Sequence, residues 1–198
     1  DFSNFRISRM EKELEQQPAN CIRVVLFGPE STGKTTLSIA LAKHYNTVFV
    51  PEYAREYLQR KWDQQKAICS KEDLIPIAKG QIKLENELAK KANKVLICDT
   101  DILQTKVYSE VYFDGFCDSN IEFYSKKNHY DLYFLCEIDV PWVEDDLRDK
   151  PNERKLMFDR FELELKKQKL PYIKLNGSHN YRLSTAIAYI DNLIESKN

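Results

Sequence analysis

The sequence of 198 residues predicts an α/β fold in which a five-stranded parallel sheet lies between two layers of helices. The first observation is an alternation: short apolar runs rich in β-branched residues are followed by segments whose apolar residues recur at helical spacing. The second is a turn that holds two of the chain's five glycines, GPESTGKT at residues 28–35, between the first apolar run and the first helical segment. Successive βαβ units of this kind build a parallel sheet with helices on both faces.

Five apolar runs define the expected strands. Residues 22–27 (IRVVLF) are apolar almost without interruption, as expected for a strand that is buried on both faces. The other runs lie at residues 47–50, 94–99, 132–137 and 171–178. Residues 1–20 precede the first strand and are polar and charged, so we interpret them as an N-terminal arm ahead of a domain that spans residues 21–198.

Helices are expected between these strands. The helical segments are residues 34–45, 53–61, 71–93, 102–112, 121–127 and 181–196, together with an amphipathic helix that follows a charged segment after residue 143. Ser70 and Asp73 have the spacing of a capping box at the start of the third helix. Pro76 lies just inside that helix and should either kink it or delay its start.

The turn at residues 28–35 matches the P-loop pattern G-x-x-x-x-G-K-T. Backbone N–H groups of such a loop and the N-terminus of the helix behind it bind phosphate, whereas the alternative is an ordinary strand–turn–helix. We therefore expect the three-layer P-loop kinase fold, with ATP and Mg²⁺ as cofactors. Lys34 is expected to contact the β- and γ-phosphates as a catalytic residue, and the Thr35 hydroxyl to bind Mg²⁺. The expected ATP-binding residues are Gly28, Glu30, Ser31, Thr32, Gly33, Lys34, Thr35, Thr36 and Asn176.

Three acidic residues follow strands at the edge of the sheet where ligands bind. Asp99 ends an apolar strand, which is the position of a metal-binding Walker B acid, although it could also cap the next helix. Asp101 has the same ambiguity, and the capping interpretation is favoured. Glu52 follows the second strand, so we expect it to be the catalytic base that accepts a proton from the acceptor hydroxyl. The alternative for Glu52 is an ion pair with Arg55.

Residues 141–155 are expected to form a lid. This segment is polar, is bracketed by Pro141 and Pro151, and carries arginines. Closure of a lid excludes water and can bring an arginine onto the phosphates. Arg148 and Arg154 are therefore candidate catalytic residues, and for each the alternative is a solvated surface charge.

Composition excludes several classes of function. The net charge of −1 gives no reason to expect a nucleic-acid or membrane partner, and no apolar run is long enough to span a bilayer. The three histidines form no ligand cluster, so no zinc site is expected. The five cysteines are scattered, and no signal peptide is visible, which indicates a reducing, cytoplasmic setting. Nothing in the sequence predicts an oligomeric state.

Five stretches, taken in order, resemble one known family. They are GPESTGKTT, PEYAREY, IPIAKGQ, CDTDILQTKVYSEVYF and YDLYFLCEIDVPWVEDDLRD, and together they resemble the ribosylnicotinamide kinase domain of NadR-type proteins over residues 23–175. The resemblance implies phosphorylation of the ribose 5′-hydroxyl of nicotinamide riboside by MgATP, giving the mononucleotide in NAD salvage. Because only about twenty residues precede the first strand, the adenylyltransferase and DNA-binding functions of that family are not carried over.

The phosphoryl acceptor that the resemblance implies is a cationic riboside. Its pyridinium ring favours a pocket with aromatic faces and acidic side chains. Two alternatives stay open: a nucleoside monophosphate kinase, in which Arg55 would hold the acceptor phosphate, and a regulatory P-loop NTPase. The D-x-x-G motif of a GTPase is absent. The expected substrate-binding residues are Glu52, Tyr53, Arg55, Asp101, Tyr108 and Trp142, with Tyr57 and Tyr112 as further aromatic candidates.

Overall fold

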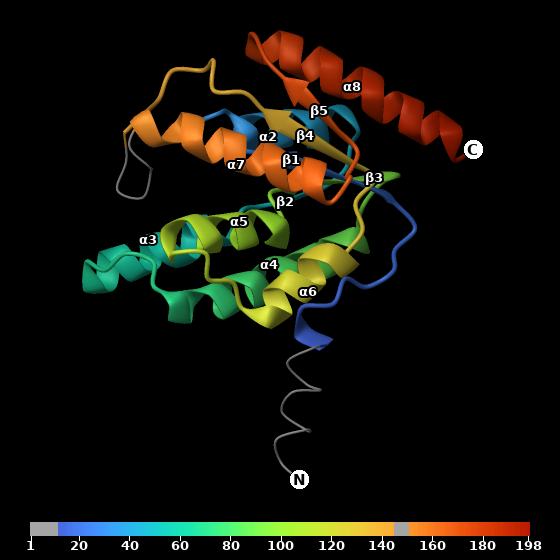
Figure 1. Cartoon of the computed structure of the whole chain (residues 1–198). Helices are drawn as coiled ribbons and strands as arrows, with labels where there is room; N and C mark the ends of the chain where they lie inside the picture. The colour runs from blue at the N-terminus through green and yellow to red at the C-terminus, as the bar shows by residue number, and fades with distance from the viewer. Residues whose placement is uncertain (1–11, 145–150) are drawn as a thin grey trace.

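The computed structural model describes residues 12–144 and 151–198 and contains one five-stranded parallel sheet in the order β2-β3-β1-β4-β5 (Figure 1). The strands are β1 (Ile22–Phe27), β2 (Phe49–Val50), β3 (Val95–Asp99), β4 (Leu132–Cys136) and β5 (Tyr172–Leu175). β1 lies in the centre, between β3 and β4. The turn after β1 therefore opens at the switch point of the sheet, where ligands of parallel α/β folds bind.

Seven α-helices lie within the described residues. They are α2 (Lys34–His44), α3 (Tyr53–Gln65), α4 (Leu74–Ala89), α5 (Ile102–Tyr112), α6 (Ser119–Lys127), α7 (Arg154–Lys167) and α8 (His179–Ser196). α3 runs four residues beyond the predicted end and stops where Lys66 adopts a left-handed conformation. α8 begins two residues before the predicted start because the Ser178 side chain accepts a hydrogen bond from Tyr181 N at 3.1 Å. β2 begins two residues after the predicted start, because only Phe49 and Val50 pair with β3.

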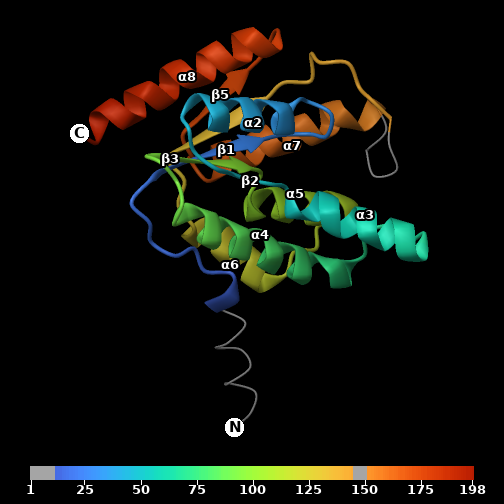
Figure 2. The same ribbon diagram turned by 180° about the vertical axis from the view of Figure 1, so that it is seen from behind.

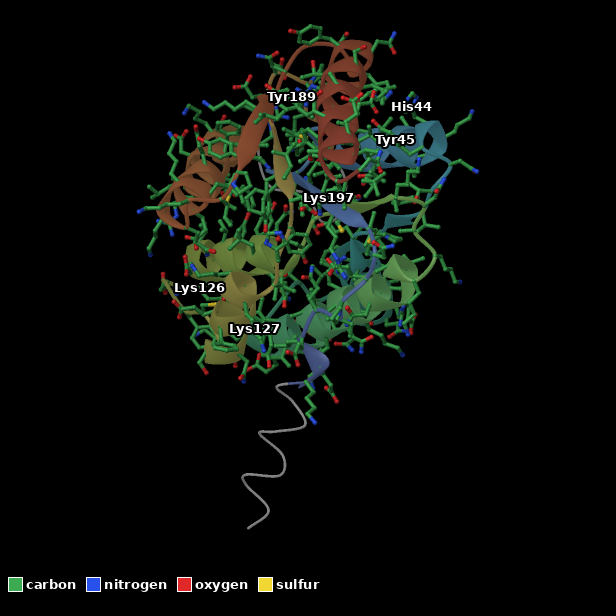
Figure 3. All side chains as sticks on the ribbon, turned by 90° about the vertical axis from the view of Figure 1, so that its right-hand side faces the viewer. His44, Tyr45, Lys126, Lys127, Tyr189 and Lys197 are labelled. Carbon is green, nitrogen blue, oxygen red and sulfur yellow. The ribbon has the colours of Figure 1, made fainter. Side chains whose placement is uncertain are left out.

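The helices form a layer on each face of the sheet, which confirms the three-layer prediction. Val24 and Leu26 of β1 face α2 and α8, whereas Val25 and Phe27 face α4, α5 and α7. Figure 2 shows the face that α2 and α8 cover. On the same side, the Tyr45 hydroxyl after α2 lies 2.8 Å from Asp191 Oδ1 on α8 and ties these two helices together (Figure 3).

The start of α4 shows how the sequence sets an element that carries the site. Ser70 and Asp73 form the predicted capping box around a 3₁₀ turn (Lys71–Asp73), and α4 follows at Leu74. Pro76 is thus in the first turn of the α-helix, where a missing N–H leaves no hydrogen bond unmade. Of the two expected effects, the proline delays the start of the helix.

The described part of the N-terminal arm packs against the domain. Leu14 is buried with apolar residues of α4, α5 and α6. The Arg23 guanidinium of β1 donates to the Gln17 carbonyl at 2.6 Å and to Glu85 of α4 at 2.7 Å. Across the described residues, no helix has the length and apolar character needed to cross a membrane.

Candidate active site

The P-loop is shaped by its two glycines. Gly28 has φ +132°, and a Cβ there would lie 3.0 Å from the Cys136 carbonyl oxygen of β4. Gly33 has φ +83° and precedes α2 without any side-chain cap, so the first N–H groups of that helix are available to an anion. Lys34 is buried, and its Nζ donates to the Pro29 carbonyl at 2.7 Å across the loop. The loop thus has the local geometry of a phosphate site.

The two residues expected to bind a metal are adjacent. β3 pairs with β1 so that Asp99 lies opposite Leu26, two residues before Gly28. The Thr35 hydroxyl donates to Asp99 Oδ2 at 2.5 Å, and Asp99 Oδ1 is buried without a hydrogen-bond partner in the described residues. Burial raises the pKa of Asp99, while nearby Lys34 and the Thr35 hydroxyl act in the opposite direction. A hydroxyl and a carboxylate with a spare oxygen fit the ligand preference of Mg²⁺.

A strained residue separates Asp99 from Asp101. Thr100 is β-branched and has φ +70°, a conformation that such residues rarely adopt outside functional sites. Beyond this bend, Asp101 caps α5: its Oδ1 accepts from Gln104 N at 3.1 Å and its Oδ2 from the Tyr133 hydroxyl at 2.6 Å. Burial raises the pKa of Asp101 to about 7. In the structure Asp101 is therefore the buried N-cap of α5, whereas Asp99 lies beside the P-loop.

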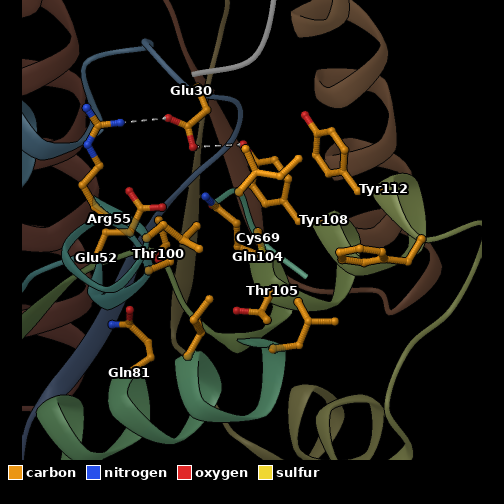
Figure 4. A pocket seen from close by; sticks show the side chains of 16 residues that line it. Glu30, Glu52, Arg55, Cys69, Gln81, Thr100, Gln104, Thr105, Tyr108 and Tyr112 are labelled. Atoms are coloured by element: carbon orange, nitrogen blue, oxygen red, sulfur yellow. Dashed lines mark hydrogen bonds and ion pairs between the residues drawn. The ribbon is translucent and has the colours of Figure 1, made fainter. Parts of the chain in front are cut away.

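A pocket of about 390 Å³ opens beside the P-loop, walled by α3, α4 and α5 (Figure 4). Of the predicted substrate residues, Glu52, Arg55 and Tyr108 line it, whereas Tyr53, Asp101 and Trp142 do not. Glu30, predicted as a nucleotide ligand, also reaches this pocket. The other lining residues are Ala54, Leu58, Ile68, Cys69, Leu74, Ile77, Gln81, Thr100, Gln104, Thr105, Tyr112 and Phe113.

Glu52 is the acid of this pocket that is suited to take up a proton. It directly precedes α3, and its side chain forms no cap hydrogen bond. Burial, together with the negative charges of Glu30 and Asp99, raises the pKa of Glu52 to about 8, although Lys34 and Arg55 pull it down. A carboxyl group with a pKa near the working pH is an efficient general base.

Glu30 crosses the mouth of the pocket. Its carboxylate lies 3.8 Å from Arg55 Nη1 and accepts a hydrogen bond from the Tyr108 hydroxyl at 3.5 Å. Figure 4 shows these contacts as a chain from α3 through the P-loop to α5. Arg55 thus has an ion pair with the P-loop glutamate, and it also lowers the pKa of Glu52.

Sequence reasoning missed the residue that holds the backbone around Glu52. The Gln81 side chain accepts a hydrogen bond from Tyr53 N at 2.9 Å and donates one to the Pro51 carbonyl at 3.2 Å. One side-chain amide is thus bonded to the residues on both sides of Glu52. The available signal was a polar residue among the apolar positions Ile77, Ala78 and Ile82 on the buried face of α4, which also holds Glu85 one turn later. A buried polar side chain needs hydrogen-bond partners, so a glutamine at such a position indicates that the helix holds another part of the chain in place.

Arginines that follow β4 in the chain form hydrogen bonds to the backbone of the P-loop. Arg154 donates from Nη1 to the Ser31 and Val140 carbonyls and from Nη2 to the Ile138 and Val140 carbonyls, at 3.0–3.3 Å. For Arg154 to contact a phosphate, some of these hydrogen bonds to backbone carbonyls would have to be replaced by hydrogen bonds to the phosphate. Arg148, the other lid candidate, lies outside the described residues, as do residues 145–150 of the predicted lid.

Arg182 of α8 escaped the sequence analysis. It is 3% exposed and donates to the Thr32 carbonyl of the P-loop and to the Glu137 carbonyl after β4, each at 3.1 Å. It also forms an ion pair with Asp139. No spacing rule links residue 182 to residue 32, so only the fold shows that the closing helix fixes the phosphate loop.

We predict that Gly80→Ala destabilises the protein, although alanine normally stabilises the interior of a helix by about 1 kcal/mol relative to glycine. A Cβ at Gly80 of α4 would lie 2.0 Å from Cε1 of the Tyr53 ring, which packs over this glycine. Overpacking of this kind costs about 1–3 kcal/mol. Urea unfolding measures the change. In a Tyr53→Ala background the same substitution should become neutral or stabilising; an equal loss in both backgrounds would refute the packing argument.

Comparison with known proteins agrees with this geometry. Residues 23–182 match the AAA_28 family model, described as an AAA domain. The chain is 32% identical over 134 residues to the trifunctional NAD biosynthesis/regulator protein NadR of Escherichia coli (strain K12). That match covers 68% of this chain and 32% of NadR. The chain thus spans about a third of the length of the curated relatives it matches.

Two solved structures of NadR share the fold. The complex with NR superposes with a TM-score of 0.63 at 23% identity and covers 89% of this chain and 51% of that one. The complex with NAD and AMP-PNP gives a TM-score of 0.67 at 22% identity and covers 87% and 49%. The resemblance seen in the sequence therefore extends to the arrangement of the whole sheet.

Proposed function

This chain belongs to the AAA_28 family of AAA domains, and we propose that it is a kinase that transfers the γ-phosphoryl group of ATP to the ribose 5′-hydroxyl of nicotinamide riboside. The product is the mononucleotide. The observation that carries the proposal is Glu52, an acid with a pKa raised to about 8 that lies between a P-loop and a pocket with aromatic walls. An NTPase without an organic acceptor has no need of such a pocket.

In the proposed reaction the acceptor 5′-oxygen forms a bond to the γ-phosphorus while the bond from that phosphorus to the ADP oxygen breaks. Glu52 accepts the hydroxyl proton. Lys34, at the N-terminus of α2, turns from the Pro29 carbonyl to the phosphates and stabilises the charge that develops there. Thr35 and Asp99 would hold Mg²⁺, which would neutralise negative charge on the phosphates of ATP.

The pocket favours a cationic riboside over a nucleoside monophosphate. Glu30 and Glu52 place two acids at its mouth, and Tyr108 stacks on Tyr112 with ring centroids 5.7 Å apart. A pyridinium ring gains about 0.5–2 kcal/mol against such aromatic faces. Arg55, the residue that an acceptor phosphate would need, is paired with Glu30. The similarity to NadR, one structure of which holds NR, supports the same acceptor class.

Several site assignments remain part of this proposal. We place Tyr53 and Trp142 at the edge of the bound riboside, and Asn176 near the nucleotide, at the end of β5. Arg148 and Arg154 are proposed to reach the phosphates when residues 141–155 close over the site. Asp101 supports the pocket through its cap on α5.

A panel of acceptors tests the proposal. ADP release is measured with ATP and, in turn, nicotinamide riboside, uridine, cytidine and nucleoside monophosphates. We expect nicotinamide riboside to give the highest kcat/KM, uridine and cytidine to be poor, and nicotinamide mononucleotide to be no acceptor. A faster reaction with any nucleoside monophosphate would favour the monophosphate kinase, with Arg55 as its phosphate ligand.

A further inference from the structure

Two buried glutamines line the pocket and differ in one respect. Gln81 on α4 is 4% exposed, and its amide oxygen and nitrogen are both hydrogen-bonded to backbone groups. Gln104 on α5 is 3% exposed, and neither its Oε1 nor its Nε2 has a partner in the described residues. Figure 4 shows both side chains on the wall of the pocket. The two glutamines can therefore be compared directly: the amide of Gln81 forms hydrogen bonds within the fold, and the amide of Gln104 does not.

An unpaired amide in a buried position is unfavourable. Removing an amide from water without replacing its hydrogen bonds costs about 1–3 kcal/mol in proteins. Leucine or methionine would fit a similar volume at Gln104 without that penalty. Unsatisfied buried groups in folded proteins therefore call for an explanation, and a ligand that completes the hydrogen bonds is one.

We propose that Gln104 is the specificity residue that recognises the carboxamide of the acceptor by amide-to-amide pairing. Its Nε2 donates to the carboxamide oxygen, and its Oε1 accepts from the carboxamide nitrogen. One planar group then satisfies both unpaired atoms at once, which a ribose hydroxyl does less well because its donor and its acceptor are the same oxygen atom. This inference rests on the proposed function, since it identifies the carboxamide as the part of nicotinamide riboside that the pocket recognises.

The helix places the amide and the aromatic rings along one line. Gln104, Tyr108 and Tyr112 follow one another at intervals of four residues on α5, so they share a face of the helix, with an axial rise of about 6 Å per step. A pyridinium ring that lies against Tyr108 can therefore direct its carboxamide along the helix toward Gln104. The 5′-hydroxyl side of the ligand is left for Glu52 and the P-loop.

The same arrangement discriminates against the acid analogue. A carboxylate has two acceptor oxygens and no donor, so it would leave Oε1 of Gln104 unpaired. It would also add negative charge beside the Glu30 carboxylate at the mouth of the pocket. The pocket is thus expected to select the amide over the acid on both hydrogen bonding and charge.

The test compares nicotinamide riboside with its analogue that lacks the carboxamide, the simple pyridinium riboside, and with nicotinic acid riboside. Wild type, Gln104→Leu, Gln104→Met and Gln81→Leu are assayed for kcat/KM with each riboside and ATP, and their melting temperatures are measured without ligand. Gln104→Met serves if Gln104→Leu does not fold, and Gln81→Leu is the matched control.

In wild type we expect the carboxamide to raise kcat/KM by about 10–100-fold over the analogue without it, the range that corresponds to two such hydrogen bonds. Gln104→Leu should reduce this ratio to within about threefold and melt at the same temperature as wild type or higher. Gln81→Leu should melt several degrees lower, because Tyr53 N and the Pro51 carbonyl lose their partner, and should keep the ratio.

Three results would overturn the inference, and they differ in what else they overturn. If Gln104→Leu slows nicotinamide riboside and the pyridinium riboside equally, Gln104 recognises the ribose or has only a structural role. If its melting temperature falls as far as that of Gln81→Leu, the amide is used by the fold. If wild type phosphorylates none of the three ribosides, the proposed function fails as well.

Discussion

Lys34→Ala is expected to lower kcat for riboside phosphorylation by about 10²–10³ while the protein stays folded. The ammonium group offsets charge that grows on the transferring phosphoryl group, so its loss is felt mainly in the transition state. Within the described residues the Lys34 ammonium donates one hydrogen bond, to the Pro29 carbonyl, so its removal should leave the circular dichroism spectrum unchanged.

Lys43→Ala is the matched control, because Lys43 is an exposed lysine in the last turn of the same helix. It should keep wild-type kinetics. Activity of Lys34→Ala within about threefold of wild type, with a normal spectrum, would contradict the assignment of the P-loop as the phosphate site.

Glu52→Gln is expected to lower kcat by about 10²–10⁴ and to change KM for the riboside little, because the amide keeps the size of the side chain but cannot accept a proton. The pH profile gives a second readout. The pKa of Glu52 is raised to about 8, and the base works only when deprotonated. In wild type, kcat/KM should therefore rise tenfold per pH unit below about pH 8 and level off above it.

In Glu52→Gln this rise should disappear. The variant should also be at least as stable as wild type at pH 8 and above: a carboxyl whose folded pKa is raised loses stability as the pH climbs from its unfolded pKa to its folded one, and glutamine does not titrate. Glu56→Gln, on the exposed side of α3, is the control. If Glu52→Gln keeps its turnover and only KM rises, Glu52 binds the substrate and Asp99 becomes the candidate base.

The sequence predicted the sheet and the P-loop because these depend on local patterns. An apolar run such as residues 22–27 can only be a buried strand here, and Gly28 and Gly33 occupy positions where the backbone requires glycine. The strand-end position of Asp99 follows from the same pattern, and its contact with Thr35 confirms that these two residues are neighbours.

What the sequence could not predict are contacts between distant residues and the direction of side chains. The sequence favoured a cap only for Asp101, and the structure adds the bend at Thr100, which sends Asp99 to the P-loop and Asp101 to the start of α5. Gln81 and Gln104 are both glutamines on amphipathic helices, and only the packed structure shows that the first is bonded and the second is not. Arg182 reaches the Thr32 carbonyl across 150 positions of the chain.

The most direct test of the account follows the γ-phosphoryl group itself. The protein is incubated with ATP labelled in that group and with nicotinamide riboside, and the products are separated. We expect the label in the 5′-phosphate of the mononucleotide, with one labelled mononucleotide formed for each ADP. Label found only in inorganic phosphate, at a rate that the riboside does not change, would identify an NTPase and contradict the proposal that this pocket holds a phosphoryl acceptor.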